Sequence, residues 1–189
     1  MLASRPFRQF FIKLHRASSL HYDFRLEHGG VLKSWVLADG LCLDPTVFRS
    51  AVSVADHEVK SGGLEKVFPP GHYGAGPTML WDYGIWIPCQ DVGEALQDGH
   101  LVFHLLGSKV RGIWSLRRRP VRSGVRGKDW LLKKERDAEA WPLSERNVVA
   151  EMPKSVLSGR TLEEVAADPG HVASLKKSRV HRNQRVLPF

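Results

Sequence analysis

The sequence predicts a mainly β protein, an antiparallel barrel or sandwich with a few short helices. Short stretches in which apolar and polar residues alternate, or which are apolar throughout, recur between turn signals, whereas few stretches have helical periodicity. The candidate strands are residues 9–15, 20–28, 31–38, 51–56, 78–88, 101–106, 112–118 and 129–135. Many short strands joined by close turns are typical of antiparallel barrels and sandwiches.

Turn and cap residues connect these strands in order. Gly29-Gly30 separates the second stretch from the third and predicts a two-residue hairpin. Gly107-Ser108 offers a turn after residues 101–106. Residues 91–99 predict a short helix with Asp91 as its N-cap.

The character of the chain changes near Trp141. We therefore predict a barrel domain over residues 1–140 and a C-terminal extension over residues 141–189. Thr161 and Glu164 have the spacing of a capping box at the start of a short helix in the extension. The final residues are basic without apolar periodicity, which predicts a mobile tail and fits either a solvated terminus or a nucleic-acid arm.

Composition restricts the class of partner. The 189 residues include 42% hydrophobic residues and six tryptophans, as expected of a folded chain, and the net charge is +8. A basic chain without an amphipathic basic helix or an apolar anchor favours nucleic acid over a membrane as its partner.

The cysteines and the hydropathy indicate a cellular location. Cys42 and Cys89 lack the short spacing of a zinc knuckle and are too few for a disulfide scaffold, so we expect reduced thiols. No stretch approaches the roughly 20 apolar residues of a membrane span. We therefore expect a cytoplasmic protein associated with the nucleoid.

Three polar residues share one face of the candidate strand over residues 20–28. His21, Asp23 and Arg25 are two residues apart and point the same way, opposite an apolar face. His15 precedes them on the neighbouring strand, across a short turn, and His57 lies at the end of a later strand. Two histidines and a carboxylate suit Mn²⁺, Fe²⁺ or Zn²⁺, although a satisfied polar face has the same pattern.

Arg25 adds the chemistry of phosphate. A guanidinium beside a metal binds phosphate oxygens bidentately, and together the two groups neutralise charge at a phosphorus centre. Arg49 and the arginine-rich residues 117–128 offer further positive charge, either as nucleic-acid contacts or as a solvated loop. "PPGHYGAGP" (69–77) is most simply a rigid loop, whose His72 and Tyr73 could line a cleft.

A second chemistry fits the same residues. His21, Asp23 and His57 also spell the two-histidine-one-carboxylate triad of non-haem Fe(II) oxygenases. The adjacent Arg25 and the basic balance of the chain make this the remoter alternative.

The motifs together resemble one known family. "HRASSLHYDFRLE" and "GVLKSW", then "LDP…R…V-x-DH", then "P-x-GHYGAG", are similar to the 3′-phosphoesterase domain of bacterial ATP-dependent DNA ligase D, which also occurs as a stand-alone protein. The resemblance covers roughly residues 10–134. It implies a β-barrel and an Mn²⁺-dependent enzyme that removes a 3′-terminal ribonucleoside and then a 3′-phosphate from DNA or RNA ends.

The resemblance also implies residue roles. The metal ligands would be His15, His21 and Asp23, with Mn²⁺ as the cofactor and other divalent metals as substitutes. Arg25 and His57 would contact the scissile phosphate, and His57 would stabilise charge in the transition state. DNA or RNA 3′ ends would be the substrates in end-joining repair, and end-joining polymerase and ligase proteins the partners.

Some positions depart from the family pattern. Arg49 matches another basic position of the site, but Asp39 stands where relatives carry lysine and Ser61 where they carry tyrosine. Only fourteen residues precede His15, without the Arg-Asp pair of the family's N-terminal arm. These departures support an alternative, a catalytically weakened protein of the same fold that binds nucleic-acid ends.

Overall fold

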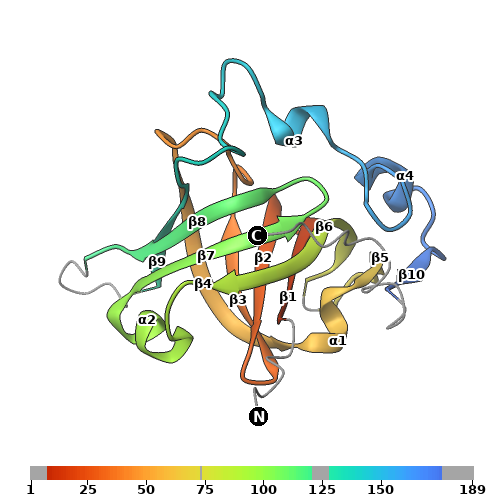
Figure 1. The fold of residues 1–189 in the computed structure, drawn as a ribbon. Coiled ribbons are helices and arrows are strands. Elements are labelled where there is room, and N and C mark those ends of the chain that lie inside the picture. The colour runs from red at the N-terminus through yellow and green to blue at the C-terminus, as the bar shows by residue number, and fades with distance from the viewer. Residues whose placement is uncertain (1–7, 73, 121–127, 176–189) are drawn as a thin grey trace, which may run out of the picture.

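Eight antiparallel strands close into a barrel in this computed structural model, which describes residues 8–72, 74–120 and 128–175. The ring runs, in spatial order, through β1 (Arg8–Arg16), β2 (Leu20–His28), β3 (Val31–Leu37), β4 (Phe48–Glu58), β9 (Asp129–Lys134), β8 (Arg111–Arg118), β7 (His100–Gly107) and β6 (Gly76–Pro88) (Figure 1). The ring closes because β6 also pairs with β1. The predicted mainly β fold, and the barrel that the family resemblance implied, are confirmed.

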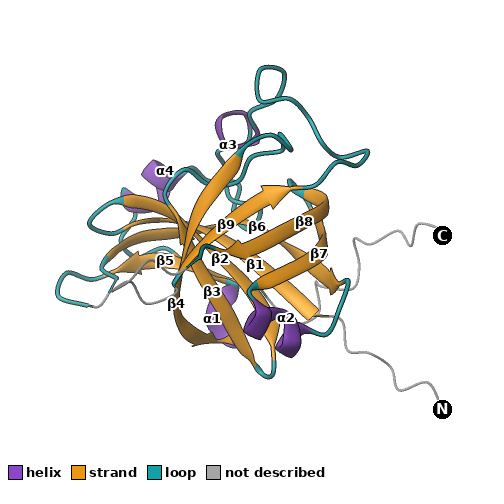
Figure 2. Ribbon diagram, turned by 90° about the vertical axis from the view of Figure 1, so that its left-hand side faces the viewer, coloured by secondary structure: helices purple, strands orange, loops and turns teal. Residues whose placement is uncertain are grey.

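In the described part of the chain, two further strands and four short helices lie outside the ring. β5 (Leu64–Phe68) pairs with the first residues of β6, and β10 (Val172–Ser174) pairs with β5. The helices are α1 (Val59–Gly62), α2 (Val92–Asp98), α3 (Val148–Glu151) and α4 (Leu162–Ala166). Figure 2 shows α2 at one end of the barrel and α3 and α4 at the other. No helix within the described ranges has the length and apolar character needed to cross a bilayer.

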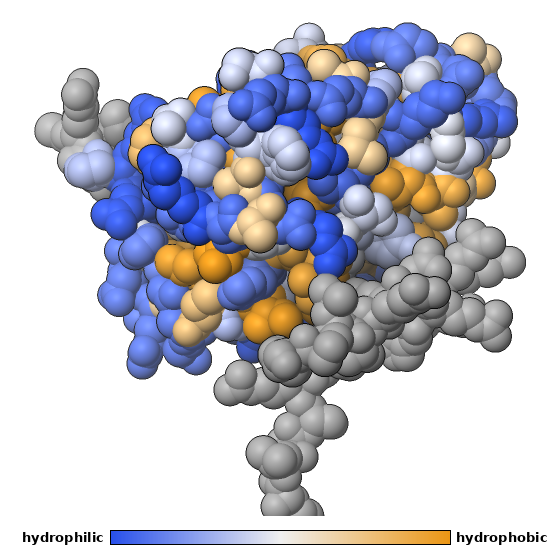
Figure 3. Space-filling view, turned by 45° about the horizontal axis from the view of Figure 1, so that its top comes forward, coloured by the Kyte–Doolittle hydropathy of each residue, from blue (hydrophilic) through white to orange (hydrophobic). Residues whose placement is uncertain are grey.

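The barrel interior is filled by alternate side chains of the strands. Large aromatic residues dominate it, and the largest that are fully buried are Trp81, Trp86, Trp114, Phe10, Phe24 and Phe103. Several of these rings meet edge to face or stacked, with centroids about 6 Å apart. On the face shown in Figure 3, hydrophobic residues occur only in small groups between hydrophilic ones.

Most local predictions are confirmed. Gly29 and Gly30 have φ angles of 60° and 79°, the left-handed pair that a tight hairpin requires. Asp91 accepts from the Glu94 backbone N–H at the start of α2, and Thr161 and Glu164 form the reciprocal capping box of α4. The chain also turns after Gly107, between β7 and β8.

Other elements were predicted only in part or not at all. β4 begins at Phe48 and ends at Glu58, longer than the predicted strand at residues 51–56. β5, β10, α1 and α3 have three to five residues each. Such short elements carry too little periodicity to stand out in the sequence, because tertiary pairing supplies their stability.

The described part of the C-terminal extension packs on the barrel. Val148, Leu162 and Val165 belong to the same buried core as the barrel strands. The Trp81 indole donates to the Met152 carbonyl at 2.8 Å, and α4 packs beside β6 and β5. The division at residue 140 stays a prediction, and the predicted mobile tail lies almost wholly outside the described residues.

Candidate metal and phosphate site

The predicted site residues, apart from Arg49, lie on the outer face of the barrel wall. β1 and β2 pair so that His15 is opposite His21, Lys13 opposite Asp23 and Phe11 opposite Arg25. The residues between them point into the barrel core, so strand alternation places these six side chains outside. The site is therefore carried by two adjacent strands of a closed, rigid wall.

Three potential ligands converge at this face. One ligand atom from each of His15, His21 and Asp23 lies within 4.8 Å of the other two. The Asp23 carboxylate oxygens are 3.6 Å from Nε2 of His21 and 3.9 Å from Nδ1 of His15. These distances are too long for hydrogen bonds but close to the about 3.4 Å that separates two ligands of one tetrahedral ion.

Backbone carbonyls orient both imidazoles. Nδ1 of His21 lies 3.0 Å from the Ser19 carbonyl, and Nε2 of His15 lies 2.9 Å from the Gly74 carbonyl. A carbonyl only accepts, so these nitrogens carry the protons and the opposite nitrogens present lone pairs toward Asp23. Fixing the tautomer through the remote nitrogen is how proteins prepare histidine ligands. The donor set thus fits a divalent transition metal.

The histidine environment also favours the neutral form that a ligand needs. Burial lowers the pKa of His15, an effect that the Asp23 carboxylate partly opposes. Gly74 belongs to the predicted loop at residues 69–77, so one function of this loop is to orient His15. His72 of the same loop stacks on Phe68, with ring centroids 5.0 Å apart, and Tyr73 lies outside the described residues.

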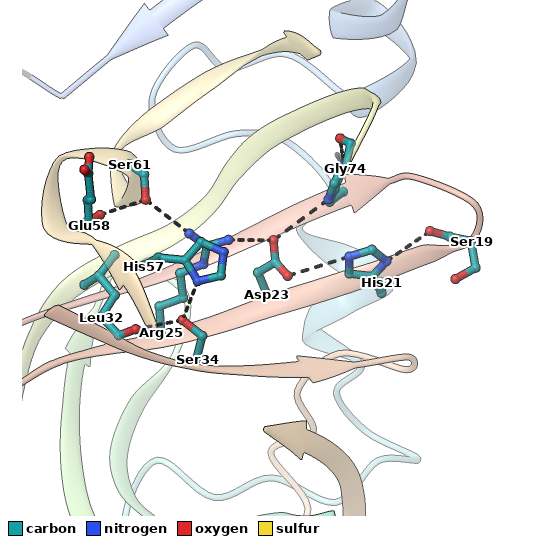
Figure 4. A network of polar contacts seen from close by, with 11 residues as sticks. Ser19, His21, Asp23, Arg25, Leu32, Ser34, His57, Glu58, Ser61 and Gly74 are labelled. Atoms are coloured by element: carbon teal, nitrogen blue, oxygen red, sulfur yellow. Dashed lines mark hydrogen bonds and ion pairs between the residues drawn. The ribbon is translucent and has the colours of Figure 1, made fainter. Parts of the chain in front are cut away.

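Arg25 is buried beside the ligand cluster. Its Nη2 donates to Asp23 Oδ2 at 3.1 Å and its Nη1 to the Ser61 hydroxyl at 3.3 Å, while Nε has no partner among the described residues. The Ser61 hydroxyl in turn donates to the Glu58 carbonyl at 2.7 Å. Burial lowers the pKa of Arg25, and the Asp23 carboxylate opposes this effect by raising it. The guanidinium therefore stays positively charged. A fixed positive charge thus lies next to Asp23 (Figure 4).

His57 reaches the outer face because β4 is irregular. Ser53 pairs with the inward Trp35, so strict alternation would turn His57 inward as well. The register shifts between Leu32 and Ser34, which places His57 opposite Leu32 on the outside. This irregularity brings His57 to the side of Arg25.

A hydrogen-bond relay sets the orientation of the His57 ring. The Ser34 hydroxyl donates to the Leu32 carbonyl at 2.9 Å and so accepts from His57 Nδ1 at 3.2 Å (Figure 4). His57 Nε2 is left for other contacts. Burial, and then the charge of Arg25, lower the pKa of His57. The structure groups His15, and not His57, with His21 and Asp23 as potential ligands.

Arg49 lies apart from this cluster. It occupies the start of β4, opposite the core residue Leu132, about 25 Å along the strand from His57. Its Nη1 is 3.9 Å from the Asp39 carboxylate, and no described contact joins it to Arg25. A role for Arg49 at this phosphate site therefore stays a prediction.

The arginine-rich segment is only partly described, since residues 121–127 lie outside the described ranges. Arg118 stacks over the Trp130 ring at 4.7 Å and donates to the Gln97 carbonyl at 3.2 Å. Arg118 therefore stabilises the fold, whereas Arg117 and Arg119 are exposed.

The sequence prediction missed Lys13. This residue is 3% exposed, and its strand neighbours place it directly opposite Asp23. Burial and the charge of Arg25 lower the pKa of Lys13 to about 7, although Asp23 acts in the opposite direction. The available signal was its position two residues before His15, which puts both side chains on one face of the strand.

The sequence is similar to known proteins. Residues 13–118 match the family described as the DNA ligase D 3′-phosphoesterase domain. The chain is 48% identical over 156 residues to the "Multifunctional non-homologous end joining protein LigD" of Pseudomonas aeruginosa, which covers 82% of this chain and 18% of that protein. It is 32% identical over 135 residues to the proteins named LigD of Mycobacterium bovis and Mycobacterium tuberculosis, covering 70% of this chain and 17% of each relative.

The chain spans less than a fifth of the length of these curated relatives. The matched residues include the last four residues of β1, all of β2 and β3, and His57, so the family match covers the whole candidate site. Because that match extends over more than half of the sequence, the chain belongs to the DNA ligase D 3′-phosphoesterase domain family.

Proposed function

We propose that this protein is a metal-dependent phosphoesterase that processes the 3′ ends of DNA or RNA during end-joining repair. The single observation that carries the proposal is the cluster of His15, His21 and Asp23, with both imidazoles oriented by carbonyls, beside the buried Arg25. The names of its relatives, which refer to non-homologous end joining, support the cellular process.

The residues would divide the work at the phosphate. His15, His21 and Asp23 would hold a divalent cation, Mn²⁺ in this proposal; when bound, it supplies Lewis-acid charge at the phosphoryl oxygens. Arg25 would bind a non-bridging oxygen through the guanidinium edge that Asp23 and Ser61 hold in place. His57, with Nδ1 donating to Ser34, would stabilise the developing negative charge by donating from Nε2 as an imidazolium.

The substrates in this proposal are 3′-phosphate and 3′-terminal ribonucleoside ends, and the product is a 3′-hydroxyl. The chemistry requires positive charge around a phosphorus centre, which the site provides on the outside of the barrel where a nucleic-acid end has access. End-joining polymerase and ligase proteins are the proposed partners, since they act on a 3′-hydroxyl end.

The proposal is tested with purified protein, Mn²⁺ and primers that end in 3′-phosphate or in a 3′-ribonucleotide. We expect release of phosphate by the wild type and loss of at least 100-fold in rate for His21→Ala and Asp23→Ala, since each removes one proposed ligand. His104→Ala, a histidine on β7, is the matched control and should retain activity. Turnover by His21→Ala and Asp23→Ala at the wild-type rate would refute the proposal.

A second function is favoured by two observations. Asp39 lies 3.9 Å from Arg49 and offsets its charge, and Ser61 contacts Arg25 only as a short hydroxyl. A protein that binds ends without turning them over would show DNA binding that weakens with salt and no product with any metal. Phosphate release that depends on His21 and Asp23 excludes this alternative.

A further inference from the structure

Two buried polar groups outside the roles described above lack partners next to the candidate metal cluster. Lys13 is 3% exposed, and no hydrogen bond or ion pair joins its ammonium to any residue that the structure describes. The Thr78 hydroxyl is buried, and within the described ranges it has no partner either. Such groups normally find a hydrogen bond, so two together on one face call for an explanation.

Strand pairing places both groups at the cluster. Lys13 lies on β1 opposite Asp23, and Thr78 lies on β6 opposite His15. Both therefore share the outer face with the potential metal ligands. The charge of Lys13 acts on Asp23 and Arg25, and it also reaches His15 and His57. Lys13 thus lies within electrostatic range of most of the site.

The nearby carboxylates are already engaged. Asp23 accepts from Arg25 at 3.1 Å. Glu65 accepts from Ser155 at 2.5 Å and from the Leu80 backbone N–H at 3.2 Å, and it lies 2.8 Å from His171 Nε2. Neither carboxylate pairs with the Lys13 ammonium. A buried cation without a paired anion is costly, so an anion bound beside it would be stabilised.

We propose that Lys13 and Thr78 form an anion-binding subsite for a phosphate group at the nucleic-acid 3′ end. This inference rests on the proposed function and adds a second cation to Arg25, on the neighbouring strand opposite Asp23. The Lys13 ammonium donates to a phosphate oxygen as a point charge, and the Thr78 hydroxyl adds a neutral hydrogen bond.

Binding of inorganic phosphate tests the subsite directly. Calorimetry on metal-free and Mn²⁺-loaded protein should show affinity about tenfold or more weaker for Lys13→Met than for wild type, because a charge-assisted hydrogen bond is lost. Lys13→Arg should retain most of the affinity, and Thr78→Val should lose a few-fold. Lys33→Met is the matched control, because Lys33 lies on β3 and pairs at the surface with Asp56.

Thermal unfolding separates this function from a structural one. Removing a buried ammonium that has no partner should raise the melting temperature of Lys13→Met, whereas a lysine that held the fold together would lower it. If Lys13→Met does not fold, Lys13→Gln and Thr78→Val give the same binding comparison. Phosphate affinity equal to wild type in the folded variants overturns the subsite, and so does a wild-type protein that binds no phosphate.

Kinetics keep the two proposals apart. With a 3′-phosphate primer, Lys13→Met should raise KM and the inhibition constant of phosphate by about tenfold. If the wild type turns over the primer and Lys13→Met has an unchanged KM and phosphate affinity, the subsite proposal is refuted. The phosphoesterase proposal is then still supported. Phosphate binding that depends on Lys13, in a protein without turnover, supports the subsite and removes the catalytic proposal.

Discussion

At the scale of single residues, the site depends on where each imidazole keeps its proton. Ser19 and Gly74 carbonyls hold the protons of His21 and His15 on the side away from Asp23. Ser34 does the same for His57, since its own proton goes to the Leu32 carbonyl. Each histidine is therefore prepared before a ligand arrives, which reduces the reorganisation that binding requires.

The titration of His57 gives a residue-scale prediction. Burial and the charge of Arg25 hold the pKa of His57 below its ordinary value of 6.5, so just below that pH the unfolded chain binds more protons than the folded one. The contribution of His57 to the free energy of unfolding should therefore rise as pH increases toward 6.5, and fall again as the solution is acidified. A two-dimensional NMR titration of the metal-free protein measures the pKa.

His57→Gln should flatten the rise of the unfolding free energy with pH below 6.5, as measured by urea titrations. The rise should not vanish, because the pKa values of His15 and His28 are lowered too. His104→Gln serves as the control. A His57 pKa above 6.5 in the metal-free protein would contradict the prediction.

At the scale of elements, β6 decides whether the barrel closes. Its residues pair with β1 along most of their length and with β7 from Gly84 to Pro88. Gly84 lies where the two pairings overlap, opposite Phe10 on one side and Gly107 on the other. A Cβ atom there would collide with the Leu106 carbonyl and lie 2.9 Å from the Phe10 ring. Glycine at this position permits the close approach of three strands.

Gly84→Ala should therefore destabilise the protein by about 3 kcal/mol, at the upper end of overpacking effects, because the obstacle is backbone. Urea unfolding followed by tryptophan fluorescence measures the change. Gly170→Ala is the control, since its nearest neighbour would be 3.7 Å from the new Cβ and its φ is not in the left-handed region. Equal stabilities of the two variants would show that the position where β6 pairs with both β1 and β7 tolerates a side chain.

Element geometry also explains which parts of the site were predictable. The short turn between β1 and β2 makes His15 and His21 neighbours, so their approach follows from sequence spacing. His57 was placed correctly at the end of a strand, but its face depends on the irregularity in β4. Arg49 shares that strand, yet it lies at the far end and on the opposite face. Alternation within a strand is local, whereas a register shift depends on its partner strand.

At the scale of the whole molecule, hydrogen bonds to a buried carboxylate connect the C-terminal extension to the barrel. Glu65 on β5 is fully buried and accepts from Ser155 at 2.5 Å, with His171 Nε2 at 2.8 Å. β10 pairs with β5 beside this contact. The extension therefore packs against the outer face of the barrel that carries the site. It does so through its hydrogen bonds to Glu65 and through its apolar residues Val156 and Leu175.

Loss of the contact between Glu65 and the extension gives a prediction with a definite pH dependence. Burial disfavours the charged form of Glu65, yet its hydrogen bonds prevail and lower its pKa below the ordinary value of 4.5. Its stabilising contribution is therefore present above pH 4.5 and is lost as the pH falls through the folded-state pKa.

His171→Ala should lower the free energy of unfolding at pH 7 by about 1–3 kcal/mol, since a charged buried group loses a hydrogen-bond partner. The difference from wild type should shrink as the pH falls below 4.5 and Glu65 takes up a proton. Urea unfolding at several pH values measures this, with His104→Ala as the control. A difference that stays constant with pH would assign the effect to packing.

The sequence by itself determined the strand pattern, the hairpin at Gly29-Gly30, the helix caps and the shared face of His21, Asp23 and Arg25. These depend on alternation and on local backbone preferences, which reach only a few residues along the chain. Only the tertiary structure decided that Lys13 is buried without a partner, that Ser34 and Gly74 orient two histidines, and that His57 faces outward. Those facts depend on barrel closure and on strand register, which bring together groups as distant in the sequence as His15 and Gly74, 59 residues apart.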